Sequence, residues 1–294
     1  PIPFILDKSS TAFLRRNLLC WTSISSDMAL PPVKGRRGSI STLRLSQGKG
    51  IERGVLARWP MTTVIVALGG SLLRPEVEER HSWLAGLVSV IRDRVSMNDR
   101  IGIVVGGGAP AREGIELARP MITDESHLDK IGIAATRLNA TIVRESLSDS
   151  GIPVSGTIPK SIDEAVLLLE TRQVVVMGGT NPGHTTDAVA IRFAISSGAD
   201  KCIIATNVPK VFDSDPKSNP DAIPYDFLTH GQLLEIIGSS EHVRAGTSQI
   251  VDPIGAIDAS ESGLTLNILD GRNVDLIREA ILGGDFQGTE VRGG

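Results

Sequence analysis

The stretch VVVMGGTNPGHTTDAVAIRFA, residues 174–194, decides how this chain is organised. It begins as a β-branched apolar run, typical of a buried strand, and ends as an apolar stretch with helical character. Glycines, threonines, a histidine and an aspartate crowd the turn between them. Gly178 and Gly179 permit a tight turn, Pro182 stiffens it, and the threonine hydroxyls offer donors and acceptors to a small polar ligand. The turn is therefore predicted to clamp a ligand.

The same pattern occurs twice earlier in the chain. Residues 62–68 form a β-branched run that ends in Gly69-Gly70-Ser71, with a helical pattern around 82–95. Residues 100–105 form another apolar run, which is followed by Gly106-Gly107-Gly108 and then by a helical pattern. Glycine lets a phosphate approach the backbone, and a helix N-terminus offers unpaired N–H groups. Because ligands bind beyond the carboxyl ends of parallel strands, the three turns together predict an anion-binding edge.

Strands and helices alternate along the rest of the chain. A long helix is predicted over 126–149, where apolar residues recur at spacings of three and four. Further strands are predicted at 201–208 and 264–269, and a short helix near 273–282. This alternation predicts an α/β fold with a mostly parallel sheet covered on both faces. The apolar residues of the long helix are Ile131, Ala135, Leu138 and Ile142.

Composition narrows the class of protein. The chain has 294 residues, of which 41% are hydrophobic and 22% charged, as in ordinary globular proteins. No apolar run approaches the roughly 20 residues needed to span a bilayer, so no membrane partner is expected. Cys20 and Cys202 make neither a disulfide framework nor a metal cluster, so we expect a reducing, cytoplasmic setting and no protein-held metal.

Charge separates the first sixty residues from the rest. Residues 1–60 contain ten Lys and Arg against three Asp and Glu, a net charge of +7; the whole chain carries −4, so residues 61–294 carry −11. An acidic body repels a polyanion, which argues against a nucleic-acid partner. Residues 1–60 are rich in Arg and Ser and are expected to have little fixed structure. Two interpretations stay open: a targeting leader, or an over-extended reading frame that truly starts at Met61.

Two better-known glycine motifs fit poorly. Gly106 to Ala111 matches G-x-G-x-x-A, but the region where a dinucleotide fold needs a strand ending in an acidic residue has a helical pattern instead. Gly178 to Thr185 matches the phosphate-binding G-x-x-x-x-G-K-[ST] motif except that His184 replaces the lysine. Neither motif is favoured.

A family resemblance rests on six motifs that appear in order between residues 61 and 294. They are LGGSLL (68–73), VVGGGAPAREGIELA (104–118), LDKIGIAATRLNA (128–140), MGGTNPGHTTDAVA (177–190), ATNVPKVFDSDP (205–216) and VRAGTSQIVDPIGA (243–256). Together they resemble the archaeal-type uridylate kinases of the amino-acid-kinase superfamily. The resemblance implies one three-layer αβα domain over 61–294, with an acceptor half at about 61–170 and an ATP half at about 171–294. It further implies transfer of the γ-phosphate of ATP to UMP in pyrimidine nucleotide synthesis, Mg²⁺ carried by ATP, and a homohexamer.

The resemblance also assigns site residues. It places the phosphates of ATP at Gly70, Ser71 and Gly108, with the Arg112 guanidinium beside the transferring group; Gly70, Ser71 and Arg112 are the implied catalytic set. Adenosine is expected beside Thr206, Asn207, Phe212 and Asp215. For UMP, it implies Gly107 near the phosphate and Asp129 near the ribose. The loop that wraps the acceptor consists of Thr180, Asn181, Pro182, Gly183, His184, Thr185 and Thr186.

Some positions depart from the family pattern. Pro209, Lys210 and Phe212 stand where D-G and Tyr are usual, which puts ATP affinity or donor choice in question, and Asp258 stands where a lysine is common. With no lysine before the first glycines, charge balance falls to Arg112, magnesium and Lys210. Two other functions stay open: a kinase of this fold for another small acid or phosphate, and a non-catalytic relative that binds nucleotides or oxyanions.

Overall fold

The computed structural model describes residues 61–73, 80–216, 218–239 and 251–293, all of which belong to one compact unit, Gly50–Gly294. Both interpretations of residues 1–60 therefore lie outside the described residues, as does most of the motif at 243–256.

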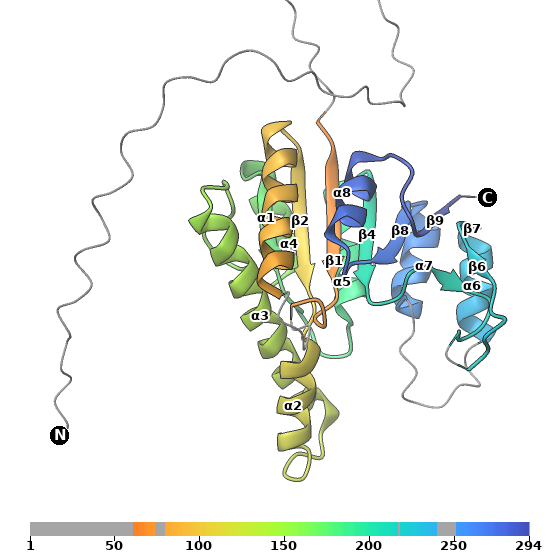
Figure 1. Ribbon diagram of the computed structural model, residues 1–294. Helices are drawn as coiled ribbons and strands as arrows, with labels where there is room; N and C mark the ends of the chain where they lie inside the picture. Colours follow the sequence, from red (N-terminus) through yellow and green to blue (C-terminus); the bar gives the residue numbers. More distant parts are fainter. Residues whose placement is uncertain (1–60, 74–79, 217, 240–250, 294) are drawn as a thin grey trace, which may run out of the picture. The chain divides into compact units, whose positions relative to one another are not determined.

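Helices and strands alternate through the described chain (Figure 1). In order they are β1 (Thr63–Leu68), α1 (Arg80–Ser96), β2 (Arg100–Val105), α2 (Gly108–Ala118), α3 (Glu125–Asp149), α4 (Ile162–Thr171), β3 (Val174–Met177), α5 (Thr186–Ser197), β4 (Lys201–Thr206), β5 (Val211–Phe212), β6 (Pro224–Tyr225), β7 (Phe227–Thr229), α6 (His230–Ser239), α7 (Pro253–Ser262), β8 (Leu266–Asp270), α8 (Val274–Leu282) and β9 (Thr289–Arg292).

Seven strands form one sheet in the order β3-β2-β1-β4-β8-β9-β7. Strands β3, β2, β1, β4 and β8 are mutually parallel, whereas β9 runs antiparallel to β8. The two short strands β5 and β6 pair separately, as an antiparallel ribbon. The predicted α/β fold with a mostly parallel sheet is therefore confirmed.

Two apolar cores lie on the two faces of the sheet. Alternate residues of a strand point to opposite faces, and β1 shows this directly: Val64 and Val66 belong to one core, Ile65 and Ala67 to the other. The first core packs the sheet against α1, α3 and α8, the second against α4, α5, α6 and α7. A sheet buried on both faces explains why its central strands are continuously apolar rather than alternating.

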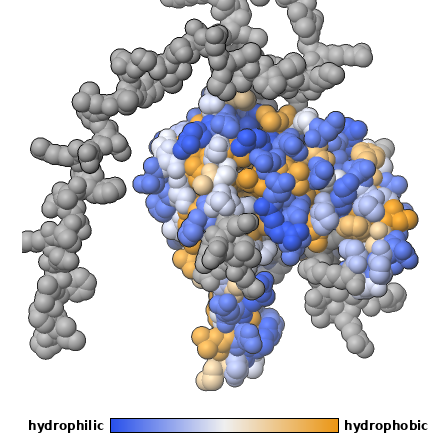
Figure 2. Space-filling view, viewed as in Figure 1, coloured by the Kyte–Doolittle hydropathy of each residue, from blue (hydrophilic) through white to orange (hydrophobic). Residues whose placement is uncertain are grey.

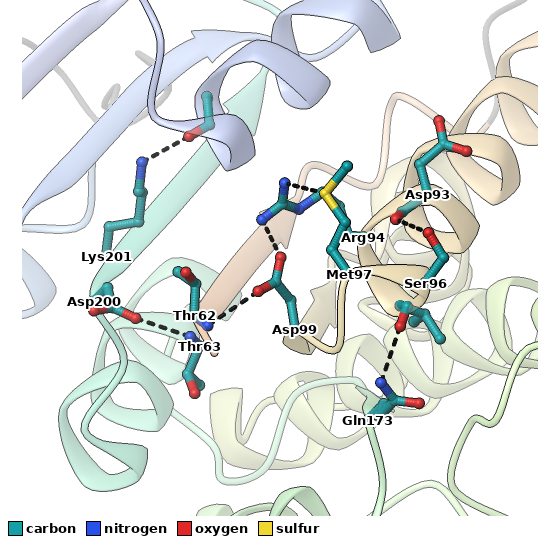
Figure 3. Close-up of polar contacts among 12 residues, drawn as sticks. Thr62, Thr63, Asp93, Arg94, Ser96, Met97, Asp99, Gln173, Asp200 and Lys201 are labelled. Atoms are coloured by element: carbon teal, nitrogen blue, oxygen red, sulfur yellow. Dashed lines mark hydrogen bonds and ion pairs between the residues drawn. The ribbon is translucent and has the colours of Figure 1, made fainter. Parts of the chain in front are cut away.

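The amino ends of the strands are tied together by side chains (Figure 3). Asp99 accepts a hydrogen bond from the Thr62 N–H at 3.0 Å and forms a buried ion pair with Arg94. Asp200 accepts from the Thr63 N–H at 2.8 Å. At this edge of the sheet, carboxylates of the protein itself accept hydrogen bonds from main-chain N–H groups.

The long helix α3 was predicted correctly, but the stripe of apolar residues predicted on it is not its buried face. Leu138 and Ile142 are exposed. The buried residues of α3 are Leu128, Thr136, Asn139, Ala140, Val143 and Leu147. Two of these residues, Thr136 and Asn139, are polar, so a search for regularly spaced apolar residues did not detect the buried face. The pattern also gave no sign of α4, α6, α7, β9 or the short strands β5 to β7.

Candidate functional site

The ends of four neighbouring strands bring the glycine turns together. Leu68 at the end of β1 pairs with Val105 of β2 on one side and with Ala205 of β4 on the other. On the far side of β2, Val104 pairs with Met177 of β3. The turns that follow β3, β2, β1 and β4 therefore line one edge in that order. Three inter-strand spacings give a row of about 14 Å, long enough for the phosphate groups of two nucleotides that meet end to end.

The first two turns touch backbone to backbone. A Cβ built on Gly70 would lie 2.2 Å from the Gly108 nitrogen and 2.6 Å from the Gly106 carbonyl carbon. Gly108 has a φ of +60°, and a Cβ there would lie 2.4 Å from the Gly70 oxygen. Glycine is required at both positions, because any side chain would separate the turns. The close contact leaves a surface made of main chain.

Helix α2 begins at this contact without a cap. Gly107 is its N-cap residue and supplies no side-chain hydrogen bond. The first N–H groups of a helix have no intrahelical acceptor, so those at the start of α2 are free to bind an anion. Arg112 lies one turn into α2, is exposed, and takes part in none of the ion pairs found among the described residues. Figure 1 shows α2 projecting beyond this edge of the sheet.

Helix α3 holds two of the loops in place. The Asn139 side chain donates to the carbonyls of Gly106 and Gly107 at 2.8 and 3.0 Å. The Thr136 hydroxyl accepts from the Gly179 N–H at 2.7 Å, and the Asp129 carboxylate accepts from the Gly183 N–H at 2.7 Å. Sequence reasoning missed Thr136 and Asn139. Their signal was a pair of polar residues three apart within a helix, which becomes informative once that helix is known to be buried.

Asp129 has a structural role that the sequence did not predict. It was expected near the ribose, and the structure places it under the loop 180–186, with one carboxylate oxygen bonded to Gly183. Gly183 has a φ of +80°, so glycine suits this turn. In the same loop Asn181, Pro182 and His184 are exposed, while Thr180 and Thr186 are half-buried.

Only one of the three turns leads directly into an uncapped helix. Helix α5 is capped by Thr185, whose hydroxyl accepts from the Ala188 N–H at 3.2 Å. After Ser71 the chain makes a turn, and α1 begins at Arg80, beyond the undescribed residues 74–79. The expectation that each glycine turn opens a helix N-terminus to the ligand is thus supported for α2 alone.

Asp187 is the most perturbed carboxylate at this edge. It lies in the first turn of α5, and burial, followed by the nearby charge of Asp252, raises its pKa to about 6. Asp252 caps α7 by accepting from the Gly255 N–H at 2.9 Å. Carboxylates with a perturbed pKa are often found at functional sites. The site predicted from the sequence did not include Asp187.

The donor side lies beyond β4 and β5. Thr206 ends β4, the exposed Asn207 follows it, and Phe212 lies half-buried in β5. The exposed Asp215 accepts from the Ser218 hydroxyl at 3.2 Å. Lys210 forms an ion pair with Asp226. This lysine was expected to help balance phosphate charge, but its ammonium group already has a partner on the protein.

The described residues contain no candidate metal-binding cluster and no candidate membrane-spanning helix. Within 61–73, 80–216, 218–239 and 251–293 there is no group of three or more His, Cys, Asp or Glu side chains that could hold a metal ion. None of the helices that the structure describes combines the length and the apolar character needed to cross a membrane.

Comparison with known proteins assigns the family. Residues 62–269 match the model of the amino acid kinase family, and the chain belongs to that family. Among curated relatives, a uridylate kinase of Methanospirillum hungatei is 36% identical over 231 residues, which cover 79% of this chain and 95% of the relative. A uridylate kinase of Natronomonas pharaonis is 40% identical over 232 residues, covering 78% of this chain and 97% of the relative.

A solved structure agrees with these relatives. The uridylate kinase of Archaeoglobus fulgidus superimposes with a TM-score of 0.68 at 36% identity, covering 78% of this chain and 99% of that one. The resemblance deduced from the motifs is therefore confirmed at the level of sequence and of fold.

Proposed function

We propose that this protein is a UMP kinase that transfers the γ-phosphate of ATP to UMP, giving UDP and ADP in pyrimidine nucleotide synthesis. The observation that carries the proposal is the row of turns along one sheet edge, because it can align a donor and an acceptor end to end. The clamp-like loop 180–186 follows β3 at one end of the row, and Thr206, which ends β4, is followed by Asn207 at the other. The uridylate kinases described above support UMP as the acceptor.

The transfer needs no covalent intermediate on the protein. An oxygen of the UMP phosphate attacks the γ-phosphorus of ATP while the bond from that phosphorus to the β,γ-bridging oxygen breaks, and ADP leaves with the bond electrons. The protein aligns the two phosphates and stabilises the spread negative charge. In this proposal the main chain of Gly70, Ser71, Gly107 and Gly108 holds the phosphates. The Arg112 guanidinium lies beside the transferring group, and Mg²⁺ arrives with ATP as part of the substrate.

The acceptor and the adenosine have separate sets of residues. Asp129 and the loop from Thr180 to Thr186 bind UMP, with Asn181, Pro182, Gly183, His184 and Thr185 between those ends. Thr206, Asn207, Phe212 and Asp215 border adenosine. Because Phe212 lacks the phenol hydroxyl and Lys210 is paired with Asp226, we expect the donor to be held mainly by main chain and by stacking.

A coupled assay of ADP release tests the proposal. Purified protein with Mg²⁺-ATP is given UMP, CMP, dCMP or no acceptor. We expect ADP release with UMP well above the acceptor-free blank. Turnover only with another small acid or phosphate would indicate a different kinase of this fold, and nucleotide binding without turnover would indicate a non-catalytic relative; either result would overturn the proposal.

The proposal includes a homohexamer working in the cytoplasm. Leu117 and Met121, at the far end of α2, are 84% and 87% exposed, and Figure 2 shows apolar side chains gathered there. Leu138 and Ile142 of α3 add a second exposed apolar strip. Apolar residues exposed in this way favour subunit contacts. Light scattering after size-exclusion chromatography measures the assembly, and a monomer at micromolar concentration would contradict this part of the proposal.

A further inference from the structure

An ion pair between two helices reaches the acceptor loop. Arg192 on α5 donates from Nε to Oδ2 of Asp258 on α7 at 2.7 Å. The two helices approach closely one turn earlier, where a Cβ on Gly255 would lie 2.9 Å from the Ile191 Cδ1 atom. This close packing sets Asp258 beside Arg192.

The other end of the same guanidinium meets His184. Arg192 Nη1 lies 3.3 Å from His184 Nε2. A guanidinium is always protonated and can only donate, so the imidazole Nε2 must be the acceptor. The ring proton then resides on Nδ1. We infer that Arg192, held by Asp258, is a positioning residue that fixes the His184 ring of the acceptor loop as the Nδ1–H tautomer, presenting one defined N–H donor to the acceptor nucleotide.

Stability alone gives a weak reason for this arrangement. The side chains of Arg192 and Asp258 are 32% and 26% exposed, and a shallow hollow of about 360 Å³ opens beside them. Ion pairs open to solvent contribute little to folding. His184 is exposed, so few neighbouring side chains pack against its ring. The ring orientation is therefore set by hydrogen bonding more than by packing.

Two measurements test this inference, which rests in part on the proposed function. The first is the tautomer of His184, read from solid-state ¹³C–¹⁵N correlation spectra of histidine-labelled protein at pH 8. The chain has five histidines, and the His184 signals are assigned by their loss in His184→Gln. We expect a single Nδ1–H form in the wild type and a mixture of both tautomers in Arg192→Leu.

The second measurement is steady-state kinetics on the same proteins. Arg192→Leu is expected to raise KM for UMP about fivefold, with kcat and KM for ATP within about twofold of the wild type, because an interaction made before the chemical step is lost. Arg192→Lys keeps the charge but not the planar fork, so it should pair with Asp258 and still release the ring. Arg119→Leu, which removes another exposed arginine that pairs with Glu125, is the matched control and should change neither readout.

The outcomes separate the two proposals. An Nε2–H or doubly protonated ring in the wild type overturns the inference, and so does an unchanged KM for UMP in both Arg192 variants. If the wild type releases no ADP with UMP, the proposed function has failed, and the tautomer spectra still decide whether Arg192 fixes the ring.

Discussion

The two edges of the central sheet treat the same chemical group in opposite ways. At the amino ends of the strands, Asp99 and Asp200 accept hydrogen bonds from the N–H groups of Thr62 and Thr63. At the carboxyl ends, glycines leave the main chain accessible, and α2 begins without a side-chain cap. The first edge satisfies these donors with carboxylates of the protein. The second edge, although Asp129 accepts from the Gly183 N–H, leaves the first N–H groups of α2 for a phosphate. The difference indicates that stability is concentrated at the first edge and binding at the second.

The strongest test of this contrast is Gly70→Ala. The new Cβ would collide with the backbone of Gly106 and Gly108, neither of which can move as a flexible side chain would. We expect kcat/KM for UMP to fall at least about 100-fold, or about 2.7 kcal/mol in barrier, with a loss of roughly 1–3 kcal/mol in the free energy of unfolding. Gly156→Ala is the control, since a Cβ there would meet nothing within 4 Å. Near-normal turnover in Gly70→Ala would show that the two turns need not touch.

Asp99→Ala tests the opposite edge. It leaves the buried Arg94 guanidinium without its carboxylate and the Thr62 N–H without its acceptor. Breaking a buried pair in this way should lower the free energy of unfolding by about 3 kcal/mol, measured by urea denaturation. Arg119→Gln, which breaks the exposed pair with Glu125, should leave the free energy of unfolding close to that of the wild type. The kinetic constants of folded Asp99→Ala should match those of the wild type. A loss of activity without a loss of stability would contradict the assignment of stability to one edge and binding to the other.

Arg112→Ala tests whether the unpaired cation at the carboxyl edge serves the reaction. We expect kcat to fall more than tenfold, at least about 1.4 kcal/mol of barrier, because the developing negative charge loses a partner. The free energy of unfolding should stay within about 0.5 kcal/mol of the wild type, since Arg112 is exposed. Arg119→Ala, at the other end of the same helix, is the matched control. Wild-type kinetics in Arg112→Ala would remove Arg112 from the mechanism.

The last test concerns stability alone and changes Asp187, a carboxylate at the carboxyl edge whose charge burial opposes. Its pKa is about 6 in the folded state, above its ordinary value of 3.8, so the folded state binds the proton more tightly. The stability that this group contributes is fully present below about pH 4 and is lost as the pH rises through 6. Asp187→Asn lacks this loss, so relative to the wild type it should gain about 2 kcal/mol between pH 4 and pH 8. Parallel profiles of unfolding free energy against pH would show that burial does not oppose its charge.

Much of the fold could be predicted from local sequence patterns, and the features that could not be predicted share one cause. β-branched runs and the glycines after them gave β1 to β4 and β8, because strand length and turn chemistry depend on adjacent residues. The apolar spacing along α3 did not reveal its buried face, because Thr136 and Asn139 look like surface residues until their partners are known. Lys210 was expected to be available for phosphate for the same reason, since its partner Asp226 lies sixteen positions away.

The sequence by itself determined that glycine turns end three parallel strands, and therefore which edge of the sheet binds. Tertiary structure decided which groups at that edge are used by the protein and which stay available. The hydrogen bonds from Asn139 to Gly106, from Gly179 to Thr136 and from Gly183 to Asp129 span 33, 43 and 54 positions. Propensity and periodicity act over a few residues, so partners at such separations are fixed only when helix and strands pack together.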